Sequence, residues 1–129
     1  MSTNPYTRYQ EAATLSADPG HLVVMLYDGA IRACRSAQNL MAERKLLQAH
    51  AALMRAQRIL QELHQTLDLD RGDIAVRLDQ LYQYMLGRLV EANVRKDGAA
   101  AAEVQALLEE LRGAWAQAAH SQGIVAEGR

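Results

Sequence analysis

The chain has 129 residues, about the length of one domain, and half of them are apolar. The apolar half is dominated by 23 alanines and 18 leucines, which favour helices, whereas phenylalanine is absent and only 5% of the residues are aromatic. This composition excludes an all-β fold. The net charge is −1 and runs of lysine or arginine never exceed two residues, so the sequence indicates no nucleic-acid partner.

Membrane insertion and secretion are not expected either. The longest uninterrupted apolar stretch is residues 22–27, far short of the roughly 20 residues that a membrane span needs. Residues 1–5 have neither the basic region nor the apolar core of a signal peptide. We therefore expect a cytoplasmic protein with no direct membrane insertion.

Four segments carry apolar side chains at the three- and four-residue spacing that is typical of helices. In the first segment, Asp18 is suited to the N-cap position and Pro19 to the first helical position. In chain order, the helices are expected over residues 18–41, 46–67, 72–96 and 97–121.

Short connections of about three to five residues join these segments, so consecutive helices should lie antiparallel as neighbours. The expected fold is all-α: an antiparallel up-down four-helix bundle over residues 18–121. Residues 1–17 lie outside this pattern and are expected to form a short N-terminal helix or arm that caps the bundle. Residues 122–129 are expected to be a flexible tail.

The sequence lacks the residue patterns of catalysis or metal binding. Di-iron bundles use Glu-x-x-His pairs, and no glutamate here has a histidine three residues later. His50 and His64 are four helical turns apart and cannot hold one ion together. Cys34 is the single cysteine and is expected to be a small buried filler, and Trp115 is expected in the core or in packing at a helix end. We expect no cofactor, no metal and no enzymatic activity.

Two of the helices have more apolar residues than one buried face can hold. In the first helix the excess residues are Val23, Val24, Met25, Tyr27 and Ile31; in the third they are Val76, Tyr82, Tyr84, Leu86 and Val90. Two interpretations stay open from the pattern alone: the N-terminal arm covers the excess, or it lines a groove for a partner helix.

Several blocks of sequence resemble one known family. The blocks are Asn4-Pro5-Tyr6-Thr7-x-Tyr9-Gln10, Ala17-Asp18-Pro19-Gly20-x-Leu22, Met25-Leu26-Tyr27-Asp28-Gly29-Ala30, Ala56-Gln57-x-Ile59-Leu60-x-Glu62-Leu63, Leu67-Asp68, Leu81-Tyr82-x-Tyr84-Met85-x-x-Arg88-Leu89-x-Glu91-Ala92-Asn93, Glu103-Val104 and Leu111-Arg112-x-Ala114-Trp115. Together they span about residues 4–119 in one register, and they resemble the flagellar secretion chaperone (FliS) family.

The resemblance implies a function as well as a fold. Members of this family are cytosolic helical bundles with a mobile N-terminal segment, and they bind the disordered C-terminal region of newly made flagellin. This binding prevents premature polymerisation and delivers flagellin to the membrane-embedded type III export gate. An anti-sigma factor or other flagellar regulators are further partners that the resemblance suggests. The alternative that we retain is a self-associating structural bundle with no client.

The residues expected to contact the client or to gate its site come from the arm and from two helices. They are Tyr6, Tyr9, Leu15, Leu22, Met25, Leu26, Tyr27, Leu78, Tyr82, Tyr84, Met85, Arg88 and Leu89. Tyr82 and Tyr84 point about 200° apart on a helix, so at least one should be accessible. Asp28 is expected to pair with Arg88 or Arg32, and Gly29 to have a structural role.

Overall fold

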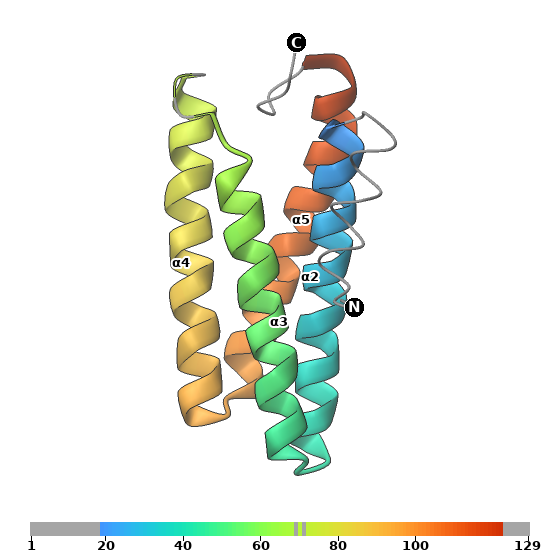
Figure 1. Ribbon diagram of the computed structural model, residues 1–129, viewed down its shortest axis with the longest axis vertical. Coiled ribbons are helices and arrows are strands. Elements are labelled where there is room, and N and C mark those ends of the chain that lie inside the picture. Colours follow the sequence, from blue (N-terminus) through green and yellow to red (C-terminus); the bar gives the residue numbers. More distant parts are fainter. Residues whose placement is uncertain (1–18, 69, 71, 123–129) are drawn as a thin grey trace, which may run out of the picture.

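The computed structural model describes residues 19–122 except residues 69 and 71. Within that part of the chain, the structure consists of helices α2 (Pro19–Ala42), α3 (Leu46–Gln65), α4 (Asp73–Arg95) and α5 (Gly98–Gln122), which run up and down in turn (Figure 1). The predicted antiparallel four-helix bundle is confirmed. The expected arm, residues 1–17, lies outside the described residues, as does all of the expected tail except Gln122, where α5 ends.

The helices occupy the corners of a square. Helix α2 packs against α3 and α5, and α4 packs against the same two helices from the opposite corner (Figure 1). Helices α2 and α4 are therefore diagonal partners. In this arrangement each helix has two neighbours, and one side of each helix faces outward.

Local backbone conformations set the helix ends. Helix α3 ends two residues earlier than the predicted Leu67, because the Thr66 hydroxyl and backbone N–H both bond to the Leu63 carbonyl and close the last turn. Gly72 precedes α4 with φ 99° and ψ −162°, a backbone conformation that residues other than glycine rarely adopt. After α4, Lys96 is left-handed (φ 51°), and the N–H of Asp97 bonds to the Ala92 carbonyl, which ends the helix.

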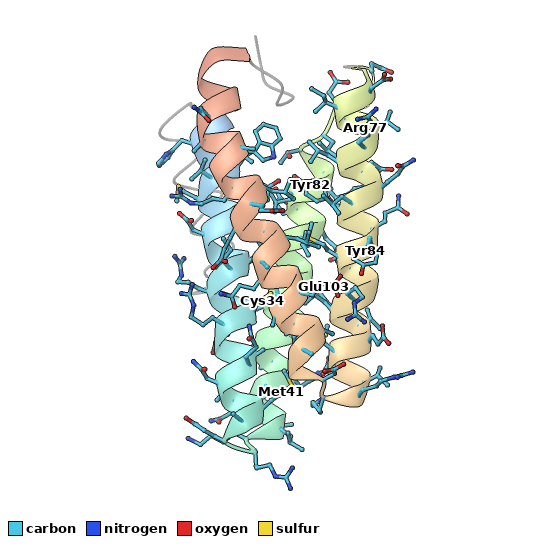
Figure 2. All side chains as sticks on the ribbon, turned by 180° about the vertical axis from the view of Figure 1, so that it is seen from behind. Cys34, Met41, Arg77, Tyr82, Tyr84 and Glu103 are labelled. Atoms are coloured by element: carbon cyan, nitrogen blue, oxygen red, sulfur yellow. The ribbon has the colours of Figure 1, made fainter. Side chains whose placement is uncertain are left out.

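The core changes character along the bundle axis. Alanines fill it where α2 ends and α5 begins, whereas large aromatic residues fill the other end. The buried alanines include Ala33, Ala37, Ala49, Ala52, Ala100 and Ala101, and the aromatic end contains Tyr27, Tyr82 and Trp115. Small side chains let helices approach closely and large ones keep them apart, and α5 leans away from α4 toward the aromatic end (Figure 2). Size grading of the core thus splays the bundle at one end.

Two expectations about single residues are confirmed. Cys34 is fully buried and Trp115 is 3% exposed, so both belong to the core. Burial raises the pKa of the Cys34 thiol to about 12, which removes the thiolate at neutral pH and fits an inert filler. No helix in the described part of the chain is long and apolar enough to cross a membrane.

Candidate functional site

The structure divides the sequence-predicted site residues by burial. Leu22, Met25, Leu78 and Arg88 are partly exposed and Tyr84 is exposed, whereas Tyr6, Tyr9 and Leu15 lie outside the described residues. The side chains that are completely covered are Leu26, Tyr27, Tyr82, Met85 and Leu89. In this conformation the covered group supports the bundle from within and offers no surface to a partner. Its part in client binding stays a prediction.

Tyr27 and Tyr82 meet in the middle of the aromatic end. Their hydroxyls are 2.5 Å apart, and their rings are tilted by 53° with centroids 6.5 Å apart. Desolvation raises the pKa of both hydroxyls, while hydrogen bonding by Trp115 opposes the rise. Both groups are therefore neutral hydrogen-bonding partners at physiological pH. The predicted divergence of Tyr82 and Tyr84 is confirmed, since Tyr82 is fully buried and Tyr84 is 48% exposed.

His64 lies between α3 and α4, at the boundary between the aromatic end of the core and the surface. Its ring stands edge-on to the Tyr82 ring, with centroids 6.4 Å apart, and its Nε2 bonds to the carboxylate of Asp79. Asp79 also accepts a hydrogen bond from Gln83. The α3–α4 side of the aromatic end is therefore held by a polar link.

Halfway along the bundle, a polar clamp ties α4 to α5. Glu103 accepts a hydrogen bond of 2.5 Å from the Tyr84 hydroxyl and one of 2.7 Å from Arg88 Nε, and Arg88 Nη1 also donates to Glu91 at 2.7 Å. These hydrogen bonds lower the pKa of Glu103 and raise the pKa of Tyr84 and of Arg88. Figure 2 shows Tyr84 and Glu103 facing each other across the two helices. Beyond this clamp, toward the aromatic end, α4 and α5 separate.

Asp28 was predicted to pair with Arg88 or Arg32, and the Arg88 alternative is wrong. Arg88 is engaged in the clamp, and Asp28 instead accepts from Arg112 Nε of α5 at 2.7 Å. The reason is topological: α2 packs directly on α5, whereas Arg88 lies on the diagonal helix α4. The Asp28–Arg112 pair fixes α5 to α2, so the separation at the aromatic end falls between α5 and α4. Gly29 is buried, which is consistent with a structural role.

An incompletely covered row of large aliphatic residues follows the separation of α4 and α5. Its α4 members are Ile74, which is 56% exposed, and the partly buried Leu78 and Leu81; its α5 members are the partly buried Leu107 and Leu111. The helices are antiparallel and the clamp pairs Arg88 with Glu103, so Leu81 lies level with about residue 110 and Leu78 with about residue 113. We call these five residues the apolar strip. Among them, only Leu78 was predicted from the sequence as a site residue.

The outer side of α4 is the second uncovered apolar region. Val76, Tyr84, Val90 and Val94 are 42%, 48%, 49% and 78% exposed. The excess of apolar residues in this helix had indicated the first three, whereas Val94 was missed. The signal for Val94 was its four-residue spacing from Val90.

The described residues contain no group of three or more histidine, cysteine or acidic side chains that could hold a metal ion. His50 is exposed and bonds to Asn93, and His64 is engaged by Asp79. What the site offers is therefore an aliphatic surface that ends at a polar clamp.

A surface of this kind suits protein recognition, and comparison with known proteins decides the family. The family described as "Flagellar protein FliS" matches residues 2–122. The chain belongs to the FliS family. Relatives support this over most of their length. The flagellar secretion chaperone FliS of Bacillus subtilis is 36% identical over 119 residues, which cover 92% of this chain and 89% of the relative.

Two further relatives come from other bacteria. The flagellar secretion chaperone FliS of Salmonella typhimurium is 38% identical, with 83% of this chain and 81% of the relative covered. The flagellar secretion chaperone FliSB of Pseudomonas aeruginosa is 34% identical, with coverage of 85% and 88%. The resemblance drawn from the sequence blocks is thus confirmed, and the FliS family is a family of chaperones, not of enzymes.

Proposed function

We propose that this protein is a cytoplasmic export chaperone that binds the C-terminal segment of flagellin, prevents its premature polymerisation and delivers it to the flagellar type III export apparatus. Membership of the FliS family and the names of its relatives, flagellar secretion chaperones, support the general role. The finer statement rests on the apolar strip, which is the observation that carries the proposal.

The strip fits a disordered client that folds on binding. Its residues on α4 follow the spacing 74, 78 and 81, so one side of a client helix can lie along them between α4 and α5. Burial of leucine side chains gives the favourable free energy, and the ordering of the client offsets part of it. Such binding is strong enough to cover an aggregation-prone segment and weak enough to release it at the export gate.

Below the strip, the clamp gives the client a polar boundary. The Tyr84 hydroxyl, Arg88 and Glu103 already satisfy one another, so a helix lying on the strip meets a closed polar surface at residue 84. The predicted site residues Leu78, Tyr84 and Arg88 therefore act together, the first as contact and the other two as the end of the site. Further partners that we propose are the export gate and an anti-sigma factor or other flagellar regulators.

A pair of matched variants tests the client site. Ile74 is the second residue of α4 and Leu47 the second residue of α3; both are exposed, at 56% and 84%. An aspartate in a first helical turn is favourable to the helix, so neither Ile74→Asp nor Leu47→Asp should unfold the bundle. We expect Ile74→Asp to weaken the affinity for monomeric flagellin by about tenfold, since a charge replaces a buried aliphatic contact.

The measurement is isothermal titration calorimetry with full-length monomeric flagellin and with flagellin that lacks its C-terminal segment. Leu47→Asp should bind as the unmodified protein does, and the truncated flagellin should not bind. Equal binding of the full-length and truncated flagellin would overturn the proposed client segment. Equal affinities of the Ile74→Asp and Leu47→Asp variants would remove the strip from the site.

A further inference from the structure

The outward side of α4 carries a regular row that the proposed client site does not use. Val76, Gln80, Gln83, Gly87, Val90 and Val94 follow one another at spacings of four, three, four, three and four residues, and all six are exposed. This alternation is the period of a coiled-coil seam. We call these six residues the outer row.

The outer row points directly away from the bundle. At about 100° per residue, its mean direction lies roughly 150° from that of the buried residues of α4. Those buried residues are Ala75, Tyr82, Met85, Leu89 and Ala92. Since α4 packs on α3 and α5 only through its other sides, the outer row is uncovered in the described part of the chain.

Three residues flank the outer row on the α5 side at seven-residue intervals: Arg77, Tyr84 and Glu91. Figure 2 shows Arg77 and Tyr84 one above the other along α4. The guanidinium of Arg77 is exposed and has no hydrogen-bond or ion-pair partner among the described residues. Glu91 bonds to Arg88, and its second oxygen lies 3.9 Å from Arg95, so the carboxylate keeps capacity for another donor.

The basic residue lies at one end of this flanking row and the acidic residue at the other, so the row is complementary in charge to an antiparallel copy of itself. When a second copy of α4 lies antiparallel on the first, Arg77 faces Glu91 of the second copy, Glu91 faces its Arg77, and Tyr84 faces its Tyr84. The same two-fold relation places Val76 opposite Val94, Gln80 opposite Val90 and Gln83 opposite Gly87. A parallel pairing would place Leu86 against Glu91 and would leave Arg77 without an acid.

We propose that the outer row is a self-association surface on which two copies of this chain pack α4 against α4 in an antiparallel, two-fold symmetric dimer. The two-fold symmetry uses each complementary contact twice, as isologous dimers do.

Gly87 adds a second argument for this dimer. Nothing lies within 4 Å of a Cβ built at this mid-helix glycine, so the bundle itself gives no steric reason for it. In the dimer the missing side chain makes room for Gln83 of the second copy. A contact through one helix of each copy is small, so the dimer is weak and concentration-dependent.

A charge-swap experiment tests this arrangement. Arg77→Glu places glutamates opposite glutamates in a homodimer, and Glu91→Arg places arginines opposite arginines. Each variant alone should therefore associate more weakly than the unmodified chain. When the two variants are mixed, both contacts become glutamate–arginine pairs, and a heterodimer should form. Analytical ultracentrifugation over a concentration series measures all three samples, and circular dichroism confirms that each variant is folded.

We expect each single variant to raise the dimer dissociation constant by about tenfold, because two exposed attractive pairs become repulsive, and the mixture to restore it. A mixture that associates no better than its components overturns the proposal, as does an unmodified chain that is monomeric at every concentration. Val90→Asp separates this surface from the client site. It should abolish self-association and leave flagellin binding unchanged. Loss of flagellin binding with unchanged self-association would assign the row to the client and overturn the dimer.

Discussion

The hydroxyls of Tyr27 and Tyr82 lie 2.5 Å apart, joining α2 to α4 across the diagonal of the bundle. Helix α2 packs closely on α3 and on α5, whereas the diagonal helices α2 and α4 meet at the splayed end through this hydrogen bond and the contact of the two rings. Both oxygens are deeply buried, so each depends on protein partners for its hydrogen bonds. The pair therefore helps to fix the position of α4, which carries Ile74, Leu78 and Leu81 of the apolar strip, relative to α2.

Removal of either hydroxyl should destabilise the bundle through the group left behind. We expect Tyr27→Phe and Tyr82→Phe each to lower the free energy of unfolding by about 1–2 kcal/mol, since each leaves a buried hydroxyl with fewer partners. The double variant should cost less than the sum of the two, by about 1 kcal/mol. Urea denaturation of the four proteins measures this coupling. Additive losses would show that the two hydroxyls act independently.

The raised pKa values of these two tyrosines predict that the protein loses stability at alkaline pH. The pKa of Tyr27 and of Tyr82 is raised above the ordinary value of 10.0 in the folded protein, so the unfolded chain releases these protons first as pH rises. Stability from the neutral hydroxyls is complete below pH 10 and is lost progressively above it. Tyrosinate absorbance and helical circular dichroism should then change together. The Tyr27→Phe/Tyr82→Phe variant should retain its helices to a higher pH, relative to its stability at pH 7, than the unmodified chain does.

Sequence patterns predicted the helices well because their causes are local. Apolar spacing, the Gly72 turn and the short connections act over a few residues, and the predicted ends differ from the observed ones by two residues or fewer. The burial of individual side chains within a helix was harder to predict. Tyr27 shares a block with the partly exposed Met25, and Tyr82 shares one with the exposed Tyr84, yet only the packing of α2 on α5 and the diagonal position of α4 decide which residues are covered.

The partners of polar side chains were harder still to predict, because these pairs join distant parts of the chain. Asp28 and Arg112 are 84 residues apart, and Tyr84 and Glu103 are 19 apart. Nothing in the local sequence of Asp28 distinguishes Arg112 from the other arginines as its partner. The choice follows from helix register, which depends on the graded core of alanines and aromatic residues.

Two glycines should respond to alanine with opposite signs. Gly72 has φ 99°, so Gly72→Ala forces a strained backbone and should destabilise the protein by about 1–3 kcal/mol. Gly87 lies inside α4 with open space around its Cβ position, so Gly87→Ala should stabilise the monomer by about 0.5–1 kcal/mol. Thermal unfolding of dilute protein compares them. Two changes of the same sign would contradict this account of the α4 backbone.

The clamp between α4 and α5 should weaken in acid. Hydrogen bonds from Tyr84 and then Arg88 lower the pKa of Glu103 below its ordinary value of 4.5. Between these two values the unfolded chain binds the proton and the native chain does not, so stability is present above pH 4.5 and falls as the pH decreases. We expect Glu103→Gln to lower the melting temperature at pH 7. It should also reduce the slope of melting temperature against pH between pH 5 and 3. Glu110→Gln, an exposed change on the same helix, is the control and should leave the slope unchanged.

Cys34 provides a measure of how often the core opens. The thiol is fully buried between α2 and its neighbours, and burial raises its pKa to about 12, so the native protein offers neither access nor thiolate. We expect a disulfide reagent at mildly alkaline pH to modify the native chain at least about a thousandfold more slowly than the chain in denaturant. Because the sequence has a single cysteine, the reaction reports this site alone. The destabilising variants Tyr82→Phe and Gly72→Ala should raise the rate in proportion to their effect on unfolding. A fast reaction in the native state would show instead that α2 separates locally from the core without global unfolding.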